Sequence, residues 1–161
     1  MNQTIQIAPV RKTIVVAAGR EHAFAVFTSG IDRWWPKTHG IGAAPIRKSF
    51  IEPFVGGRWY TACEDGADVV VGHVRVWSPG ERFVVSWEIN SDWKPDSRAA
   101  FASEVEVRFV AEGSERTRVE LEHRNFEQMG AIGGDKMRNA VDGGWPTLLE
   151  LFKTAAAAGT S

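Results

Sequence analysis

The chain has the length and composition of a single soluble globular domain. Its 161 residues are 43% hydrophobic and 24% charged, which argues against disorder and suits one sizeable core. The formal net charge is −1 at pH 7, and no basic stripe is available to neutralise nucleic-acid phosphates. We therefore predict one domain over residues 1–161, with its core from about 11 to 152, and no nucleic-acid partner.

The number of cysteines and the N-terminal segment indicate the expected cellular location. Cys63 is the only cysteine, so neither an intramolecular disulfide nor a multi-cysteine metal site can form. The apolar run at residues 13–18 is too short to span a membrane, and charged Arg20 and Glu21 follow it. We expect a first strand here rather than a signal peptide, and a cytoplasmic protein without a membrane span.

A short helix pair is predicted after this strand. Phe24 and Phe27 share one face of a helix over residues 20–29, because residues three apart lie on the same side. A helical turn over residues 31–36 ends at a proline. Residues 37–45 have little pattern and are predicted to form a loop.

Six further strands follow, as the period of the apolar residues changes from helical to alternating. Apolar and charged side chains alternate in the sixth strand of the chain, with Val105, Val107 and Phe109 set against Glu104, Glu106 and Arg108. This is the pattern of an antiparallel sheet with one wet face. The polar residues 90–100 are predicted to be a surface loop. The predicted strands cover residues 46–53, 57–64, 68–77, 82–89, 102–111 and 116–123.

A long helix is predicted at the C-terminal end, over residues 135–158. Its apolar stripe recurs at helical spacing, and Pro146 removes one backbone hydrogen bond, which predicts a kink. The element order indicates an α+β fold in which this helix lies across a curved antiparallel sheet and can enclose an apolar cavity. The stripe consists of Met137, Val141, Trp145, Leu148 and Phe152.

Recognised catalytic signatures are missing from the sequence. It has no nucleophile elbow, phosphate-binding loop, dinucleotide-binding loop or zinc-protease motif. His22, His39 and His73 do not group with one another or with a carboxylate, so we predict no metal and no cofactor. The sequence favours a protein that is not an enzyme.

His123 and the seven tryptophans each allow two interpretations. His123 shares a strand face with Leu121, so it could orient a ligand or act as acid or base. It could equally be a core histidine whose ring is satisfied by a backbone carbonyl. The tryptophans could line an apolar pocket with indole N–H donors, or they could fill a large concave sheet.

The order and spacing of several short motifs resemble one superfamily across nearly the whole chain. The sequence is similar to the START, polyketide-cyclase and birch-pollen-allergen superfamily (SRPBCC), in the branch of the activator of heat-shock-protein-90 ATPase. The motifs are Trp34-Trp35-Pro36, Gly56-Gly57-Arg58-Trp59, Gly72-His73-Val74, Ser78-Pro79-Gly80-Glu81, Ser86-Trp87, the run at residues 117–123, and Gly144-Trp145.

This resemblance implies a helix-grip fold with a cavity between the sheet and the last helix. Cavities in the superfamily bind lipids, sterols and polyketide-like molecules, and some members catalyse cyclisation or hydrolysis. The eukaryotic activator docks on its chaperone and carries a separate N-terminal domain. This chain has no room for such a domain, so we do not expect literal chaperone activation.

Our leading hypothesis is a binding module for a small apolar or amphipathic molecule, lipid-like or polyketide-like. Trp35 and Phe54 are predicted to gate the cavity, and His123 to provide a polar anchor. The other predicted ligand-binding residues are Trp59, Phe83, Trp87, Phe109, Met137, Val141 and Trp145.

Two alternatives remain open. One is an enzyme of the cyclase or hydrolase type in which His123 is the acid–base residue. The other is a protein-interaction module, either a homodimer or a chaperone partner, which requires an exposed apolar patch. Trp77 and Trp93 are the residues predicted to form that patch.

Overall fold

The computed structural model describes residues 6–158. Within this range the chain forms one antiparallel sheet of seven strands in the order β1-β7-β6-β5-β4-β3-β2. The strands are β1 (Val10–Val16), β2 (Ile46–Ile51), β3 (Arg58–Cys63), β4 (Asp68–Ser78), β5 (Arg82–Trp87), β6 (Ser103–Gly113) and β7 (Arg116–Arg124). The helices are α1 (Arg20–Phe27) and α2 (Ala131–Ala158), with short 3-10 turns η1 (Ile31–Arg33), η2 (Ala99–Phe101) and η3 (Phe126–Met129).

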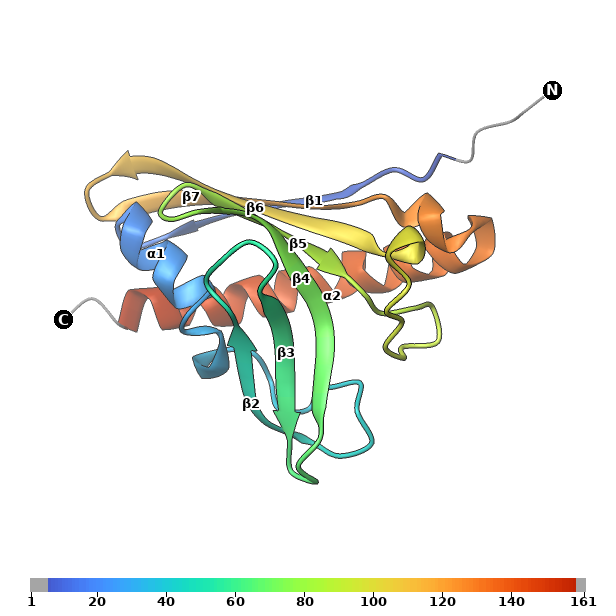
Figure 1. Ribbon diagram of the computed structural model, residues 1–161. Coiled ribbons are helices and arrows are strands. Elements are labelled where there is room, and N and C mark those ends of the chain that lie inside the picture. Colours follow the sequence, from blue (N-terminus) through green and yellow to red (C-terminus); the bar gives the residue numbers. More distant parts are fainter. Residues whose placement is uncertain (1–5, 159–161) are drawn as a thin grey trace.

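The sheet is strongly curved, and α2 lies across its concave side (Figure 1). Register shifts interrupt the pairing of β3 with β4 and of β4 with β5, and such bulges bend the bulged strand. Gly72 is necessary at this bend, because a Cβ there would lie 1.7 Å from the carbonyl oxygen of Ser86. The absence of a side chain lets β4 approach β5 closely.

The predicted α+β helix-grip architecture is confirmed. All seven strands and both main helices occur in the predicted order, and their ends differ from the predicted ones by a few residues. The largest difference is at α2, which begins at Ala131 instead of 135 and continues through Pro146 to Ala158. The kink at Pro146 stays a prediction.

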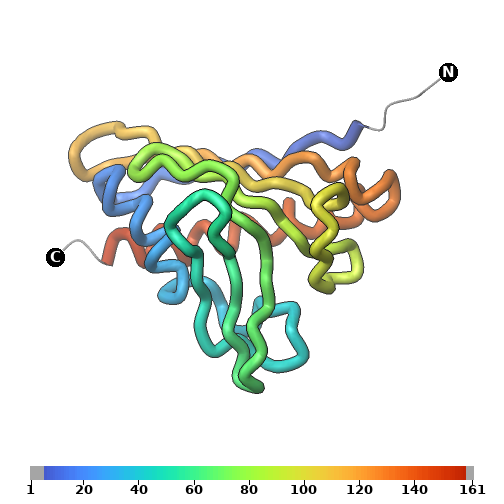
Figure 2. Tube along the Cα trace, in the orientation of Figure 1, coloured from blue at the N-terminus to red at the C-terminus, as the bar shows by residue number. Residues whose placement is uncertain are grey.

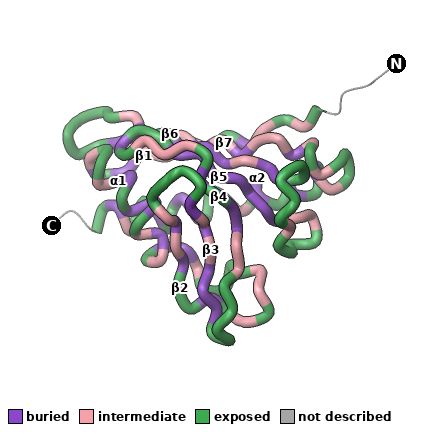
Figure 3. The backbone as a smooth tube through the Cα atoms, viewed as in Figure 1, coloured by how far each residue is buried: buried purple, intermediate pink, exposed green. Residues whose placement is uncertain are grey.

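The two faces of the sheet differ as the alternation predicted, and buried and exposed positions interchange along the strands (Figure 3). Some convex-face residues depart from the pattern: Val84 and Ser86 on β5 are buried, and Glu106 on β6 is only 3% exposed. Arg82, Arg108 and Arg124 all pair with its carboxylate. Burial raises the pKa of Glu106, but hydrogen bonds from the three arginines outweigh that effect and lower the pKa to about 2.

Aromatic rings fill the concave face near α1. Within this phenylalanine cluster, Phe27 has its ring centroid 4.8 Å from that of Phe152 on α2 and 5.4 Å from that of Phe83 on β5. Edge-to-face contacts at such distances are favourable and leave little free space. The cluster consists of Phe24, Phe27, Phe83, Phe109 and Phe152.

Neither α1 nor α2, nor any other helix within residues 6–158, has the length and apolar character needed to cross a membrane.

Candidate functional site

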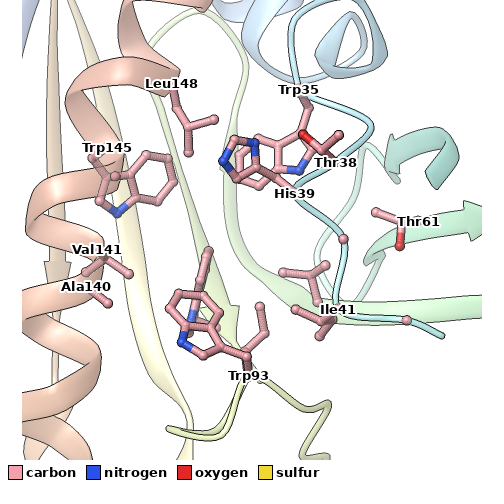
Figure 4. Close-up of a pocket in the computed structure, with 16 residues that line it drawn as sticks. Trp35, Thr38, His39, Ile41, Thr61, Trp93, Ala140, Val141, Trp145 and Leu148 are labelled. Atoms are coloured by element: carbon pink, nitrogen blue, oxygen red, sulfur yellow. The ribbon is translucent and has the colours of Figure 1, made fainter. Parts of the chain in front are cut away.

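A pocket of about 480 Å³ lies at the other end of the concave face, a volume typical of small-molecule sites. Two loops on the same side of the molecule border it, one at residues 38–42 and one that contains Trp93 (Figure 2). The pocket is lined by Trp35, Thr38, His39, Gly40, Ile41, Gly42, Thr61, Val71, Trp87, Ile89, Trp93, Ala140, Val141, Gly144, Trp145 and Leu148. Figure 4 shows the α2 side chains facing the first loop across the pocket.

The lining is apolar and carries no fixed charge. It contains no aspartate, glutamate, lysine or arginine, and His39 is its one titratable side chain. In the described part of the chain, no three histidine, cysteine, aspartate or glutamate side chains gather in a way that could hold a metal ion. Because burying an unpaired charge in such surroundings is costly, the pocket suits an uncharged molecule.

Indole rings form much of the pocket wall. Trp145 on α2 has its ring centroid 6.2 Å from that of Trp35 and 6.0 Å from that of Trp87. Trp59 lies behind this wall, with its centroid 5.3 Å from Trp35 and 5.7 Å from Trp87. The four rings brace one another, so the flat wall faces keep a defined orientation.

Two polar atoms in the wall have no hydrogen-bond partner. They are the hydroxyl oxygen of Thr61, a residue 2% exposed, and the indole nitrogen of Trp87, a residue 4% exposed. Buried polar atoms without partners are rare in native proteins and each requires an explanation. Residues 6–158 contain five such atoms in total: His22 Nε2, Ser49 Oγ, Trp59 Nε1, Thr61 Oγ1 and Trp87 Nε1. Four of the five lie on β2, β3 and β5.

His123 supports the wall from behind and does not line the pocket. The indole N–H of Trp145 donates to Nδ1 of His123 over 3.2 Å, and Nε2 lies 2.8 Å from the hydroxyl of Ser103. Since an indole can only donate, Nδ1 is the acceptor and Nε2 carries the proton. Burial lowers the pKa of His123 to about 3, so the ring is neutral at pH 7 and both nitrogens are engaged.

Four of the ten residues predicted to bind a ligand line the pocket: Trp35, Trp87, Val141 and Trp145. Trp59 and His123 stand directly behind them. The remaining four lie elsewhere. Phe83 and Phe109 belong to the phenylalanine cluster, Met137 is buried at 1% exposure outside the lining, and Phe54 is 54% exposed.

The position of Phe54 corrects its predicted place at the pocket mouth. It lies in the turn between β2 and β3, where Gly57 N–H donates to its carbonyl oxygen, and it is not among the lining residues. Trp77 also differs from the predicted exposed patch. Its ring packs 5.1 Å from Phe24 and 6.2 Å from Phe83. The homodimer and the chaperone partner stay predictions.

Several lining residues were not predicted. Thr61 is two residues after Trp59 on β3, so strand alternation predicts that the two side chains share the inner face, although Thr61 was not predicted to bind a ligand. Residues 38–42 and Trp93 gave no such signal, because a loop has no periodicity from which to assign a face.

A model of the family described as Activator of Hsp90 ATPase homolog 1-like protein matches residues 17–157. Comparison with curated proteins gives no match. The match confirms the predicted resemblance to the START and polyketide-cyclase superfamily and to this branch of it.

Solved structures show the same fold. The anthrahydroquino-gamma-pyrone synthase Txn09 is 39% identical over 92% of this chain and 97% of that chain, with a TM-score of 0.66. The self-sacrificing resistance protein CalC from Micromonospora echinospora is 33% identical over 92% and 93%, with a TM-score of 0.66. MLL2253 from Mesorhizobium loti, at 16% identity over 92% and 96% and a TM-score of 0.64, shows the fold alone.

Proposed function

The chain belongs to the family of Activator of Hsp90 ATPase homolog 1-like proteins, and we propose that it binds a small, uncharged, largely apolar molecule. The ligand is polyketide-like and carries an oxygen that accepts hydrogen bonds. It occupies the pocket between α2, the sheet and the loop at residues 38–42.

The observation that carries this proposal is the pair of unpartnered polar atoms in the apolar wall. Trp87 Nε1 can only donate a hydrogen bond, and the Thr61 hydroxyl can donate or accept. A ligand that carries hydrogen-bond acceptors would give each of these atoms a partner. The proposal thus explains why the fold keeps two polar atoms that would otherwise cost free energy.

The solved relatives support the class of ligand. Txn09 is named as a synthase of an anthrahydroquino-gamma-pyrone, and it covers almost the full length of this chain at 39% identity. Such a product is flat, aromatic and rich in oxygen acceptors. These properties match a pocket built from indole faces and two donors.

Two neighbouring glycines of α2 allow a direct test. Gly144 lines the pocket, whereas Gly143 is exposed, and a Cβ at either position meets no atom within 4 Å. Gly144→Leu is expected to fill the pocket and to weaken binding of 1,8-dihydroxyanthraquinone at least tenfold by isothermal titration calorimetry. Gly143→Leu is expected to leave the affinity unchanged.

Both variants gain helix propensity of up to about 1 kcal/mol relative to glycine, so thermal unfolding should show that both fold. Equal affinity of wild type and Gly144→Leu for the anthraquinone would refute the proposed site, as would the absence of binding to the wild-type protein.

A second candidate function is catalysis on the same kind of molecule, favoured by the likeness to a synthase. His39 would then move a proton, because it is the one titratable side chain in the described lining. Thr61 and Trp87 would polarise the carbonyl oxygen. The test is mass spectrometry of bound molecules before and after incubation. Chemical change that is lost in His39→Gln supports catalysis, and unchanged ligand supports binding alone.

A further inference from the structure

Trp93 has an unusual backbone for a residue at the edge of a pocket. It lines the pocket, yet its side chain is 41% exposed, and its φ is +59°. Large aromatic residues rarely adopt this left-handed conformation, which costs free energy and persists only where the surroundings enforce it. In Figure 4 its indole borders the pocket on the side away from Leu148 and Trp35.

The surroundings of Trp93 hold this conformation through Asn90. The side-chain oxygen of Asn90 accepts hydrogen bonds from the backbone N–H groups of Asp92 and Lys94, at 3.0 and 3.1 Å. The Asn90 carbonyl accepts the N–H of Trp93 at 2.9 Å, and Asn90 N–H donates to the Lys94 carbonyl. Ile89 and Pro95 pair as an isolated bridge below this turn.

The turn also rests on the start of α2. A Cβ at Gly133 would lie 3.1 Å from the Ser91 hydroxyl oxygen, so the missing side chain lets the loop approach the helix. The turn is therefore closed by its own hydrogen bonds and seated against α2 before any ligand arrives.

We propose that Trp93 is the residue that selects planar aromatic ligands, by stacking its pre-positioned indole on the ligand at the pocket mouth. This inference rests on the proposed function and adds the ligand shape to it. The other indoles of the wall are 7% exposed or less, whereas Trp93 is 41% exposed and has room for an aromatic ring to cover its indole. An aromatic ligand covers the indole in a preferred stacking geometry, and an acyclic chain does not.

Two probes separate stacking from simple apolar burial. 1,8-Dihydroxyanthraquinone is planar and tricyclic, whereas 2-dodecanone is acyclic, and each carries a carbonyl oxygen that can accept a hydrogen bond. Trp93→Ala is expected to weaken anthraquinone binding about tenfold and dodecanone binding less than twofold, by calorimetry. Trp93→Phe is expected to keep the aromatic preference within about threefold of wild type.

Phe101→Ala is the matched control. Phe101 is 44% exposed, close to the value for Trp93, but it does not line the pocket, so both affinities should stay unchanged. Asn90→Ala keeps the Trp93 side chain but removes the one oxygen that accepts hydrogen bonds from two backbone N–H groups of the turn. We expect it to weaken anthraquinone binding about threefold.

The outcomes are distinguishable. If wild type binds neither probe, the proposed function fails and this inference fails with it. If wild type binds both, but Trp93→Ala weakens both equally or neither, the pocket stands and the selective role of Trp93 is overturned.

Discussion

The same sheet and the same helix form both ends of the concave face, but one end is tightly packed and the other contains a pocket. Near α1, Phe27 and Phe152 lie 4.8 Å apart between ring centroids, within a cluster that fills the space between the layers. Near the loop at residues 38–42, Trp35, Trp87 and Trp145 surround a pocket of about 480 Å³.

Polar atoms follow the same division. At the packed end, the buried Thr117 hydroxyl donates to the carbonyl of Ala18 at 2.8 Å. At the pocket end, the Thr61 hydroxyl is equally buried but has no partner. The Thr117 hydroxyl thus has a partner within the fold, and the Thr61 hydroxyl does not. The two threonines differ in hydrogen bonding although both are buried, and buried polar atoms without partners require an explanation.

The largest expected difference between the ends concerns stability. Leu149 is buried outside the lining, whereas its neighbour Leu148 is part of the pocket wall. A wall residue has packing partners on fewer sides. Leu149→Ala should therefore lower the free energy of unfolding by about 4 kcal/mol, and Leu148→Ala should lower it by about 2 kcal/mol. Urea unfolding measures both, and equal losses would contradict the division into a packed end and a hollow end.

A second prediction concerns acid. Burial lowers the pKa of His123 to about 3 from 6.5, so between these values the unfolded chain binds the proton and the folded chain does not. The free energy of unfolding should therefore fall as pH falls from 6.5 towards 3, by at most about 1.4 kcal/mol per pH unit. Chemical unfolding at a series of pH values measures this slope.

His123→Gln should flatten the slope between pH 6.5 and 4.5, and His39→Gln, which removes an exposed imidazole, should retain it. An unchanged slope in His123→Gln would show that another group dominates the acid response of the pocket end.

The smallest expected effect compares the two threonines directly. Thr117→Val removes a satisfied hydrogen bond and should lower the free energy of unfolding by about 1 kcal/mol, whereas Thr61→Val removes an unsatisfied hydroxyl and should raise it by about 1 kcal/mol. Thr61→Val should at the same time weaken anthraquinone binding in calorimetry. A loss of stability in Thr61→Val would indicate a structural role for that hydroxyl.

Much of the fold was predictable because it depends on local periodicity. The alternation of Val105, Val107 and Phe109 with charged residues assigned the inner face of β6 correctly. The convex face was predicted less completely. Glu106 is buried because three arginines from β5, β6 and β7 converge on it, and convergence across strands depends on register, which periodicity does not specify.

The candidate site was predictable only in part. Alternation and helical spacing correctly predicted that Phe83, Phe109 and Trp87 point inward. They did not predict where α2 packs tightly against the sheet and where it leaves a pocket. His123 illustrates the limit. Its inward direction followed from its strand position, while its partners Trp145 and Ser103 come from another element and a neighbouring strand.

Short-range patterns in the chain were thus sufficient for the elements, their order and the side of the sheet that each residue faces. The location of the pocket, the unpartnered Thr61 and Trp87, and the place of Trp93 at the mouth depended on how distant segments meet. The physical reason is that a void forms where packing between layers is incomplete, and that is a property of the assembled layers and not of any one segment.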